Sequence, residues 1–292
     1  MKWCFILNPI SGKKACNVAA LKKSVLGCFP QSRVCLTQAP GHATQLAKEA
    51  AQEGFRAVVA AGGDGTINEV ARALVGTQTA LGVIPRGSGN GFARELGMPF
   101  SFTACLEKLK QAAPVVCDTG RANGELFLNL AGVGIEAAIA WKFMEYGKTG
   151  ARGKWPYFKL GAQAVFSYQP PELEITINGI TRVAAPLTLV FANGRQYGSN
   201  FKIAPTASLT DGKLEMVSVQ NAPKWKLALA VPAFFTDTWR PFGLTHTEQV
   251  QHALIKRPGE ILYHIDGEPR KTDGTLEISV FPKSLHLLLP QI

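Results

Sequence analysis

The sequence predicts an α/β domain over residues 1–120, built on a doubly wound and mostly parallel sheet, followed by a β-rich, sandwich-like domain over residues 121–282. In the first part, short apolar runs alternate with helical patterns and glycine-rich turns, and past Cys117 strand-like runs separated by turn residues dominate. Repeated βα units are typical of a parallel sheet, and the later runs are typical of a β-rich domain. We expect an active site in the cleft between the domains, and residues 283–292 could return to the first.

Composition and charge narrow the class of protein. The chain has 292 residues with 46% hydrophobic and 18% charged residues, which is typical of a globular protein. Its net charge of +10 favours anionic partners such as nucleic acid, phosphorylated small molecules or an acidic membrane surface. The apolar run at the N-terminus is too short for a signal peptide, and no stretch reaches the roughly 18 apolar residues that span a bilayer. These features predict a cytoplasmic protein.

Cysteines and histidines show no metal-binding pattern. The six cysteines lie in the first 120 residues without a C-x-x-C pair, at positions 4, 16, 28, 35, 105 and 117. This distribution predicts reduced, partly buried thiols rather than a zinc site or a disulfide framework. The five histidines are scattered, and we interpret them as structural or surface residues.

The first strand and its turn form the first candidate ligand site. A strand is predicted for Lys2–Leu7, a polar turn for Asn8–Lys14 and a helix for Ala15–Leu26. A polar turn with two lysines at the carboxyl end of a first strand is where α/β sheets bind phosphate-bearing ligands. A solvated loop is the alternative interpretation.

A glycine-rich turn follows the third predicted strand. A second strand, Ser32–Thr37, and a helix, His42–Glu53, lead to a buried strand at Ala57–Ala61. The turn Gly62-Gly63-Asp64-Gly65-Thr66 then opens a helix that runs to Leu74. Its glycines let the backbone approach a ligand, and we expect Thr66 to be the N-cap of a helix whose amides bind an anion. An ordinary βα turn is the alternative.

A second glycine turn has the same setting. The strand Ala80–Ile84 leads into Pro85-Arg86-Gly87-Ser88-Gly89-Asn90 and a further helix. Neither turn matches the dinucleotide fingerprint, because Asn68 and Phe92 stand where a glycine is needed. The Gly147-Lys148-Thr149 triplet is not a P-loop, because Lys142 stands at the position of its first glycine.

Three motifs in this order resemble the catalytic domain of the diacylglycerol kinase superfamily, which includes bacterial soluble lipid kinases, sphingosine kinases and ceramide kinases. They are Asn8-Pro9-x-Ser11-Gly12, Gly62-Gly63-Asp64-Gly65-Thr66-Ile67-Asn68-Glu69 and Pro85-x-Gly87-Ser88-Gly89-Asn90. The resemblance implies that ATP, with Mg²⁺, lies across these turns. The implied ATP contacts are Asn8, Pro9, Ser11, Gly12, Thr37, Gly62, Gly63, Asp64, Gly65, Thr66, Asn68, Glu69, Gly87, Ser88, Gly89 and Asn90. Many bacterial members carry Asn-Asp where this chain has Asn90-Gly91, so the acceptor lipid stays open.

The second domain contains a candidate metal turn. Glu125–Leu130 is predicted as a strand and Ala131–Glu136 as a glycine-relieved turn into a short helix. Further strands are predicted at Leu173–Ile177, Leu187–Ala192, Lys213–Val219, Ile261–Ile265 and Leu276–Phe281. The resemblance continues through Phe191–Gly194 and Ala204–Leu214, and implies a structural magnesium held by Ser208, Asp211 and Lys213. Thr210 stands where relatives often have a second acid, and one carboxylate among neutral oxygens makes a weak site. A simple β-turn is the alternative.

The segment His264–Pro269 is the candidate catalytic turn. A predicted strand ends at Ile265, and the carboxylates of Asp266 and Glu268 flank Gly267. Two close acids repel, so that one holds its proton longer or both share a cation. From the residues alone, an ordinary turn is the stronger reading. The resemblance implies that Asp266 is the general base for the acceptor hydroxyl and that Glu268 is a neighbouring nucleotide or metal contact.

Two segments interleave aromatic and basic residues: 141–159 and 224–242. This pattern suits an anionic membrane interface, where each Lys or Arg contributes about 1 kcal/mol. It also suits single-stranded nucleic acid, and aromatics that pack inward on a surface helix are the third interpretation. No nucleic-acid-binding motif is present, so we expect that nucleic acid is not a partner.

Together these features predict an ATP- and magnesium-dependent lipid kinase that acts on a diacylglycerol-like or sphingoid-like lipid and associates peripherally with the cytoplasmic membrane surface. One alternative is a kinase of a soluble substrate, because NAD kinases and phosphofructokinases carry a related Gly-Gly-Asp-Gly turn. Another is a non-catalytic lipid-binding protein, although Asp64 and Asp266 are both present. The oligomeric state, including a homodimer, is left open.

Overall fold

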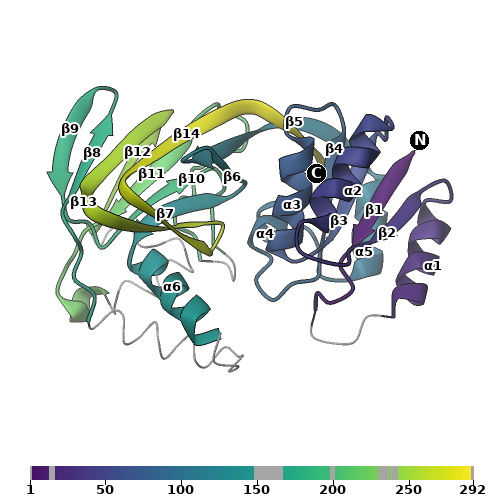
Figure 1. The fold of residues 1–292 in the computed structure, drawn as a ribbon, viewed down its shortest axis with the longest axis horizontal. Helices are drawn as coiled ribbons and strands as arrows, with labels where there is room; N and C mark the ends of the chain where they lie inside the picture. Colours follow the sequence, from purple (N-terminus) through teal and green to yellow (C-terminus); the bar gives the residue numbers. More distant parts are fainter. Residues whose placement is uncertain are drawn as a thin grey trace. The chain divides into compact units, whose positions relative to one another are not determined.

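A computed structural model of the chain describes residues 2–12, 17–147, 167–197, 201–227, 229, 236, 238 and 243–290. The chain divides into two compact units. Unit 1 comprises residues 1–119 and 282–292, and unit 2 comprises residues 120–281. The chain therefore leaves unit 1 along β5 (Ala112–Ala122) and returns to it along β14 (Glu268–Pro290) (Figure 1).

Unit 1 is built on a parallel sheet with the strand order β2-β1-β3-β4-β14. Its strands are β1 (Trp3–Leu7), β2 (Arg33–Leu36), β3 (Ala57–Gly62), β4 (Ala80–Pro85) and the last part of β14, where Leu287 pairs with Leu81. Every residue of β1, β3 and β4 is buried, as expected for central strands that helices cover on both faces. This confirms the predicted α/β fold of the first domain.

Five helices belong to the described part of unit 1: α1 (Val18–Cys28), α2 (His42–Gln52), α3 (Asp64–Leu74), α4 (Gly91–Glu95) and α5 (Phe102–Lys110). Helix α1 packs against α5, and α2 packs against α3. The step from β1 to β2 runs in the opposite direction across the sheet to the steps from β2 to β4. Since such crossovers are right-handed, α1 lies on the face opposite to α2 and α3. The direction reverses at β1 and β3, and α/β sheets bind ligands at such a point.

Unit 2 is built on antiparallel strands in the order β12-β11-β10-β7-β13-β14. Strand β13 also pairs with β8, β8 pairs with β9, and β5 pairs with β6. The strands are β6 (Glu125–Phe127), β7 (Leu130–Gly134), β8 (Leu173–Ile177), β9 (Ile180–Ala184), β10 (Thr188–Ala192), β11 (Leu214–Val219), β12 (Thr245–Val250) and β13 (His252–Ile265), and one long helix, α6, covers Ile135–Gly147. The β-rich character of the second domain is confirmed.

The two faces of β7 bury different apolar clusters. Ala131 and Val133 belong to one cluster, which also contains Tyr263 and Ile265 of β13. Leu130, on the other face, belongs to a second cluster with residues of β10 and β11. Successive side chains of a strand point to opposite faces, so β7 lies between two layers of core. Among the described helices of the chain, none is both long enough and apolar enough to cross a bilayer.

The prediction of a turn at Ala131–Glu136 is wrong. Residues 130–134 form β7, a central strand, and the strand predicted for Glu125–Leu130 ends at Phe127. The glycines misled the prediction, because a glycine inside a strand marks either a turn or a close approach. A Cβ added to Gly132 would lie 2.9 Å from Oε1 of Glu136 and 3.1 Å from Nε2 of His264, so close packing requires this glycine.

Several other elements depart from the prediction. Helix α1 begins at Val18 rather than at Ala15, with the Asn17 side chain accepting from the Ala20 amide at 3.0 Å, and residues 13–16 lie outside the described part of the chain. Helix α5 and the strands β5, β9 and β12 were not predicted. All residues of β9 are exposed, so it has no alternation of buried and exposed positions to reveal it.

Candidate active site

The two glycine turns of unit 1 pack backbone against backbone at the carboxyl ends of β3 and β4. The amide of Arg86 donates to the carbonyl of Gly62 at 2.7 Å. A Cβ added to Gly87 would lie 2.6 Å from the Cα of Gly63, and one added to Gly62 would lie 2.6 Å from the Thr66 Cβ. Only glycine fits at these positions, so the turns present backbone at the end of the sheet where ligands bind.

Asp64 joins the first turn to the second. Its carboxylate accepts hydrogen bonds from the backbone amides of Asn90, Gly91 and Phe92 at the start of α4. Burial raises the pKa of Asp64, and these amide bonds oppose the shift by stabilising the ionised form. Its Oδ1 atom is buried and has no hydrogen-bond partner among the described residues. Asp64 therefore fixes the two turns to each other and leaves one oxygen as an unused acceptor.

Thr66 was predicted to be the N-cap of α3, and this prediction is wrong. The helix begins at Asp64, and its N-cap is Gly63 in an extended conformation without a side-chain cap. Thr66 lies in the first turn of the helix and is buried, and its Oγ1 accepts a hydrogen bond from Nδ2 of Asn8 at 2.9 Å. Because Gly63, directly after β3, takes the N-cap position in an extended conformation, the helix starts at Asp64, three residues earlier than a Thr66 cap would allow. Thr66 thus connects α3 to the turn after β1.

The turn after β1 lies beside the second glycine turn. Asn8 Oδ1 accepts from the Ile10 amide at 3.1 Å, and Gly12 has a φ of 115° that favours glycine. A Cβ added to Gly12 would lie 3.3 Å from the Arg86 carbonyl and 3.9 Å from its guanidinium Nη2. Arg86 therefore places a cation beside this turn. It stands inside a motif that the sequence singled out, yet it was not among the predicted contacts.

The remaining predicted contacts of unit 1 lie in or next to the three turns or directly after β2. Pro9, Ser11, Gly65, Ser88 and Gly89 lie within or next to the three turns, and Thr37 follows β2, with its amide donating to the Leu7 carbonyl at 3.0 Å. Asn90 holds the second turn closed, because its side chain both accepts from the Gly87 amide and donates to the Gly87 carbonyl at 2.8 Å. The turns of β1, β3 and β4 are thus brought together.

Glu69 and Asn68 lie further along α3. Glu69 Oε2 accepts from the Ala43 amide at 3.1 Å, and the Glu69 carbonyl accepts from Thr44 Oγ1 at 2.9 Å. The first of these bonds supplies the cap that Gly41, at the start of α2, cannot provide with a side chain. Asn68 is buried. In this structure Glu69 caps a helix, which competes with its predicted role as an ATP contact.

In unit 2, the carboxylate of Asp266 is held by three backbone amides. Its Oδ2 accepts from Leu128 at 2.8 Å, and its Oδ1 accepts from Asn129 and Leu130 at 2.9 Å. The Asp266 amide donates to the Leu130 carbonyl at 2.8 Å, and its φ of 49° is left-handed. Three amide donors fix the orientation of this carboxylate.

Glu268 lies in an ion-pair network. Arg270 forms a bidentate pair with Glu125, with distances of 2.8 and 3.0 Å, and its Nη2 lies 3.1 Å from Oε2 of Glu268. The side chain of Glu268 is 48% exposed. Two acids therefore share one arginine, whose guanidinium neutralises charge beside the Asp266 turn.

In the turn that was predicted to hold a metal, side-chain oxygens accept hydrogen bonds from backbone amides of the same turn. Asp211 Oδ1 accepts from the Lys213 amide at 3.0 Å, and Ser208 Oγ accepts from the Thr210 amide at 3.3 Å. Among the described residues, no group of three or more His, Cys, Asp or Glu side chains could hold a metal ion. A single exposed carboxylate that already accepts a hydrogen bond makes at most a weak magnesium site.

Buried His264 and half-buried Glu136, whose two carboxyl oxygens are buried, form a titratable pair in unit 2. Burial raises the pKa of Glu136 from 4.5 to about 8 and lowers the pKa of His264 from 6.5 to about 4. Nε2 of His264 lies 3.9 Å from Oε1 of Glu136. The histidines were interpreted as structural or surface residues, and His264 is the buried one whose surroundings only the fold reveals.

The raised pKa of Glu136 predicts a pH-dependent effect of Glu136→Gln on stability. Below about pH 4.5 the carboxyl is neutral in both the folded and the unfolded state. Between pH 4.5 and 8 only the unfolded chain releases this proton, so the folded state loses stability as pH rises. Glutamine does not ionise, so the variant should gain stability relative to wild type, on the order of a few kcal/mol, between pH 5 and pH 8. Urea unfolding at both pH values measures the difference, and a difference that is the same at both would contradict it.

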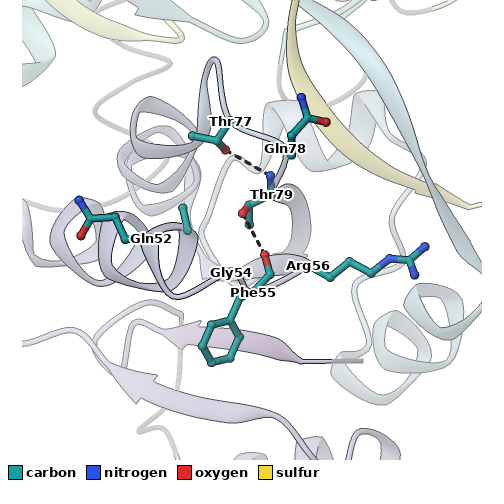
Figure 2. A pocket seen from close by; sticks show the side chains of 8 residues that line it. Gln52, Gly54, Phe55, Arg56, Thr77, Gln78 and Thr79 are labelled. Atoms are coloured by element: carbon teal, nitrogen blue, oxygen red, sulfur yellow. Dashed lines mark hydrogen bonds between the residues drawn. The ribbon is translucent and has the colours of Figure 1, made fainter.

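A pocket of about 410 Å³ lies at the opposite end of the unit 1 sheet from the glycine turns. Figure 2 shows that its lining comes from the end of α2 and from the residues before β3 and β4, including Phe55, Arg56 and Thr79. The Thr79 hydroxyl donates to the Phe55 carbonyl at 2.9 Å. This pocket lies at the amino ends of the strands and contains none of the predicted site residues.

Comparison with known proteins covers both units. Residues 2–122 match the family model "Diacylglycerol kinase catalytic domain", and residues 130–289 match "YegS C-terminal NAD kinase beta sandwich-like domain". A "Probable lipid kinase YegS-like" of Pseudomonas putida is 32% identical over 96% of this chain and 94% of its own length. A "Diacylglycerol kinase" of Bacillus subtilis is 32% identical over 74% of this chain and 73% of its own length.

Solved structures share the fold. A crystal structure of a putative diacylglycerol kinase from Bacillus anthracis has a TM-score of 0.77 at 21% identity, with 99% of this chain and 97% of that chain covered. A second diacylglycerol kinase structure from the same organism has a TM-score of 0.75 at 19% identity and covers 99% of this chain and 96% of that chain.

Proposed function

The chain belongs to the lipid kinase family that joins a diacylglycerol kinase catalytic domain to a YegS-type C-terminal domain, and on that premise we propose that it transfers the γ-phosphoryl group of ATP to a hydroxyl of a diacylglycerol-like or sphingoid-like lipid at a membrane surface. The observation that carries the proposal is the pair of interlocked glycine turns in unit 1. The backbone of Gly63 lies too close to Gly87 for a side chain at position 87, and a helix follows each turn.

In this proposal the turns of unit 1 bind the triphosphate. Backbone amides of a glycine turn and the positive end of α3 favour an anion at the switch point of the sheet. The guanidinium of Arg86, beside Gly12, supplies a positive charge to the same place. Magnesium bound with ATP would neutralise charge on the phosphates. Among the described residues no group of three or more His, Cys, Asp or Glu side chains could hold it, so the phosphates would be its main ligands.

Asp266 positions the acceptor hydroxyl and takes its proton. Its three amide bonds hold the carboxylate in one orientation. Phosphoryl transfer usually has a loose transition state in which little proton transfer is needed early, so a carboxylate held in one orientation is sufficient. We assign Glu268 to the placement of Arg270 rather than to proton transfer, because the two already form an ion pair.

Peripheral membrane association is supported by one of the aromatic-basic segments. Residues 224–227 are helical, the Trp225 side chain is 67% exposed, and Lys224 is exposed beside it. Of the two segments, residues 148–159, 228, 230–235, 237 and 239–242 lie outside the described part of the chain. An outward-facing Trp among lysines favours a membrane interface over a surface helix whose aromatic side chains pack inward.

We therefore expect Trp225→Ala to weaken binding to vesicles that contain anionic lipid, because the variant loses an interfacial aromatic side chain. Flotation on a sucrose gradient measures the bound fraction, which should fall several-fold. Phe100→Ala is the matched control, since Phe100 is also an exposed aromatic residue (54%) but its ring packs against the guanidinium of Arg94. Equal flotation of wild type and Trp225→Ala would remove this support for a membrane surface.

Transfer of labelled γ-phosphate tests the proposed reaction. Vesicles doped in turn with diacylglycerol, sphingosine or ceramide are incubated with the chain, beside a vesicle-free sample that contains NAD. Label in a lipid establishes the lipid kinase and names the acceptor. Label only in the NAD sample would instead establish a kinase of a soluble substrate. ATP binding without label in any sample would leave a non-catalytic lipid-binding protein as the better description.

A further inference from the structure

Three consecutive residues of unit 2 direct their backbone amides at one carboxylate. Residues Leu128–Leu130 run from the end of β6 into β7, and all three amides donate to Asp266. In a regular strand the N–H groups of successive residues point in opposite directions, so the backbone is bent here. Contacts other than the regular ladder of the sheet have to hold such a bend. We refer to residues 128–130 as the amide segment.

The end of β10 holds the carbonyl groups of the amide segment. Asn193 follows β10 directly, and its Nδ2 donates to the Leu128 carbonyl at 2.7 Å. The backbone amides of Asn193 and Gly194 donate to the Asn129 carbonyl at 2.9 and 3.0 Å. The first two carbonyls of the amide segment are therefore bonded to donors from residues 193 and 194.

Two peptide units connect Asn193 to Asp266. A trans peptide unit is planar, so its C=O and N–H groups point in opposite directions. The unit between residues 128 and 129 accepts from the Asn193 side chain and donates to Oδ1 of Asp266. The unit between residues 129 and 130 accepts from the amides of Asn193 and Gly194 and donates to the same Oδ1. Asn193 thus fixes the planes of both peptide units whose N–H groups hold Oδ1.

One of these bonds depends on the side chain of Asn193. Any residue except proline could donate the backbone bonds at positions 193 and 194, whereas the bond to the Leu128 carbonyl needs an N–H group on a short side chain. Asn193 and Leu128 are each only 1% exposed, so bulk water does not reach this bond. A buried carbonyl that loses its donor is unfavourable. Loss of the Asn193 carboxamide should therefore shift the amide segment.

We propose that Asn193 is a positioning residue for phosphoryl transfer: it holds the amide segment, and through it the Asp266 carboxylate, in the orientation that takes the proton of the acceptor hydroxyl. The inference rests on the proposed lipid kinase function and adds a residue that acts through Asp266. Misplacement of a reacting group by about 1 Å can cost about 10²-fold in rate, so a small shift of the amide segment is sufficient. This gives a role to the stretch Phe191–Gly194, which the sequence singled out without one.

Replacement of the Asn193 side chain tests this role. Asn193→Leu removes the donor and roughly keeps the size of the side chain, and it should lower kcat by about 10- to 100-fold. The KM for ATP should stay within about twofold of wild type, because the change removes an interaction that matters in the transition state and not in ATP binding. Asn193→Ala, which leaves room for water, should lower kcat in the same direction, and it carries the test if Asn193→Leu does not fold.

Thr188→Val is the matched control. Thr188 is also a buried polar residue of β10, and its hydroxyl donates to the Val133 carbonyl at 3.3 Å, at the other end of the β7–β10 pair. The variant loses a bond between the same two strands and leaves the amide segment unchanged, so its kcat should equal that of wild type. Equal losses of kcat in Thr188→Val and Asn193→Leu would overturn the inference.

A double-mutant cycle distinguishes positioning from a general structural role. Asp266→Asn already removes the base, so adding Asn193→Leu to it should lower kcat by less than about twofold further, because residues that act as a unit do not contribute additively. If the second change lowers kcat as much in the Asp266→Asn background as in wild type, the Asn193 side chain acts independently of Asp266. That result would overturn the inference.

Amide hydrogen exchange tests the same contact without a reaction. The amides of residues 128–130 should exchange at least about 10-fold faster in Asn193→Leu than in wild type, because the segment opens more readily. If no lipid is labelled but exchange is faster, the proposed function fails and the hold of Asn193 on Asp266 stands. If lipid is labelled and kcat is unchanged in Asn193→Leu, with or without faster exchange, the inference fails and the kinase function stands.

Discussion

Asp266→Asn is expected to lower kcat by about 10²- to 10⁴-fold, the usual contribution of a general base. Asparagine has nearly the shape of aspartate and tolerates the left-handed conformation that Asp266 adopts, with a φ of 49°. Its oxygen can still accept from the amides of Asn129 and Leu130. Its NH₂ group would face the Leu128 amide, so one backbone hydrogen bond is lost, at a cost of about 1–3 kcal/mol. The variant should therefore fold but turn over slowly.

Initial rates with labelled ATP measure the loss, and the thermal midpoint of each protein confirms that the variant is folded. Asp273→Asn is the matched control, since Asp273 is an exposed carboxylate in the same β13–β14 ladder. Its backbone stands opposite that of Glu260 in the strand register. It should retain wild-type turnover. Wild-type turnover in Asp266→Asn would show that another group accepts the proton, and the assignment of Asp266 would have to be abandoned.

Gly87→Ala is expected to weaken ATP binding by about one to two powers of ten. The new Cβ would lie 2.6 Å from the Cα of Gly63 and 3.0 Å from Oδ1 of Asn90. Because the first of these atoms is backbone, the two turns must move apart. Overpacking of this kind typically costs 1–3 kcal/mol, which is about 5- to 150-fold in a binding constant. The geometry that presents the turn amides to the phosphates would be lost with it.

Equilibrium binding of ATP, followed by calorimetry, measures the effect of Gly87→Ala. Gly27→Ala provides the control, since Gly27 lies in α1 of the same unit and a Cβ there would meet no atom within 4 Å. Alanine inside a helix is more favourable than glycine by roughly 0.5–1 kcal/mol, so this variant should be slightly more stable and bind ATP as wild type does. Normal ATP affinity in Gly87→Ala would mean that the nucleotide binds away from the glycine turns.

Much of unit 1 could be predicted from the sequence because its central strands are buried on both faces. The continuous apolar runs of β3 and β4 have no other interpretation once a helical pattern follows each of them. In unit 2 the same approach failed at β7, where Gly132 and Gly134 resemble turn residues. Their role is to admit contacts from α6, β10 and β13, and such contacts leave no trace in local periodicity. The exposed strand β9 was missed because its residues do not alternate between buried and exposed positions.

The candidate site was predicted where residue types are restricted by close backbone contact, and missed where the fold assembles ordinary residues. Gly87 is required by an approach of 2.6 Å, and this requirement is visible as a motif. Thr66 was misassigned because the extended Gly63 takes the N-cap position. Glu136 and His264 are common residue types in common positions, distant in sequence, and only the pairing of β7 with β13 brings them together. No local pattern could have indicated them.

The measurement that tests the central claim most directly is the transfer of γ-labelled phosphate from ATP into extracted lipid, with wild type and Asp266→Asn assayed in parallel on the same vesicles. The lipid kinase assignment predicts label in the lipid extract with wild type, in proportion to enzyme and time, and at least a hundredfold less with Asp266→Asn. Label that remains in the aqueous phase with every lipid, or equal lipid labelling by both proteins, would contradict it.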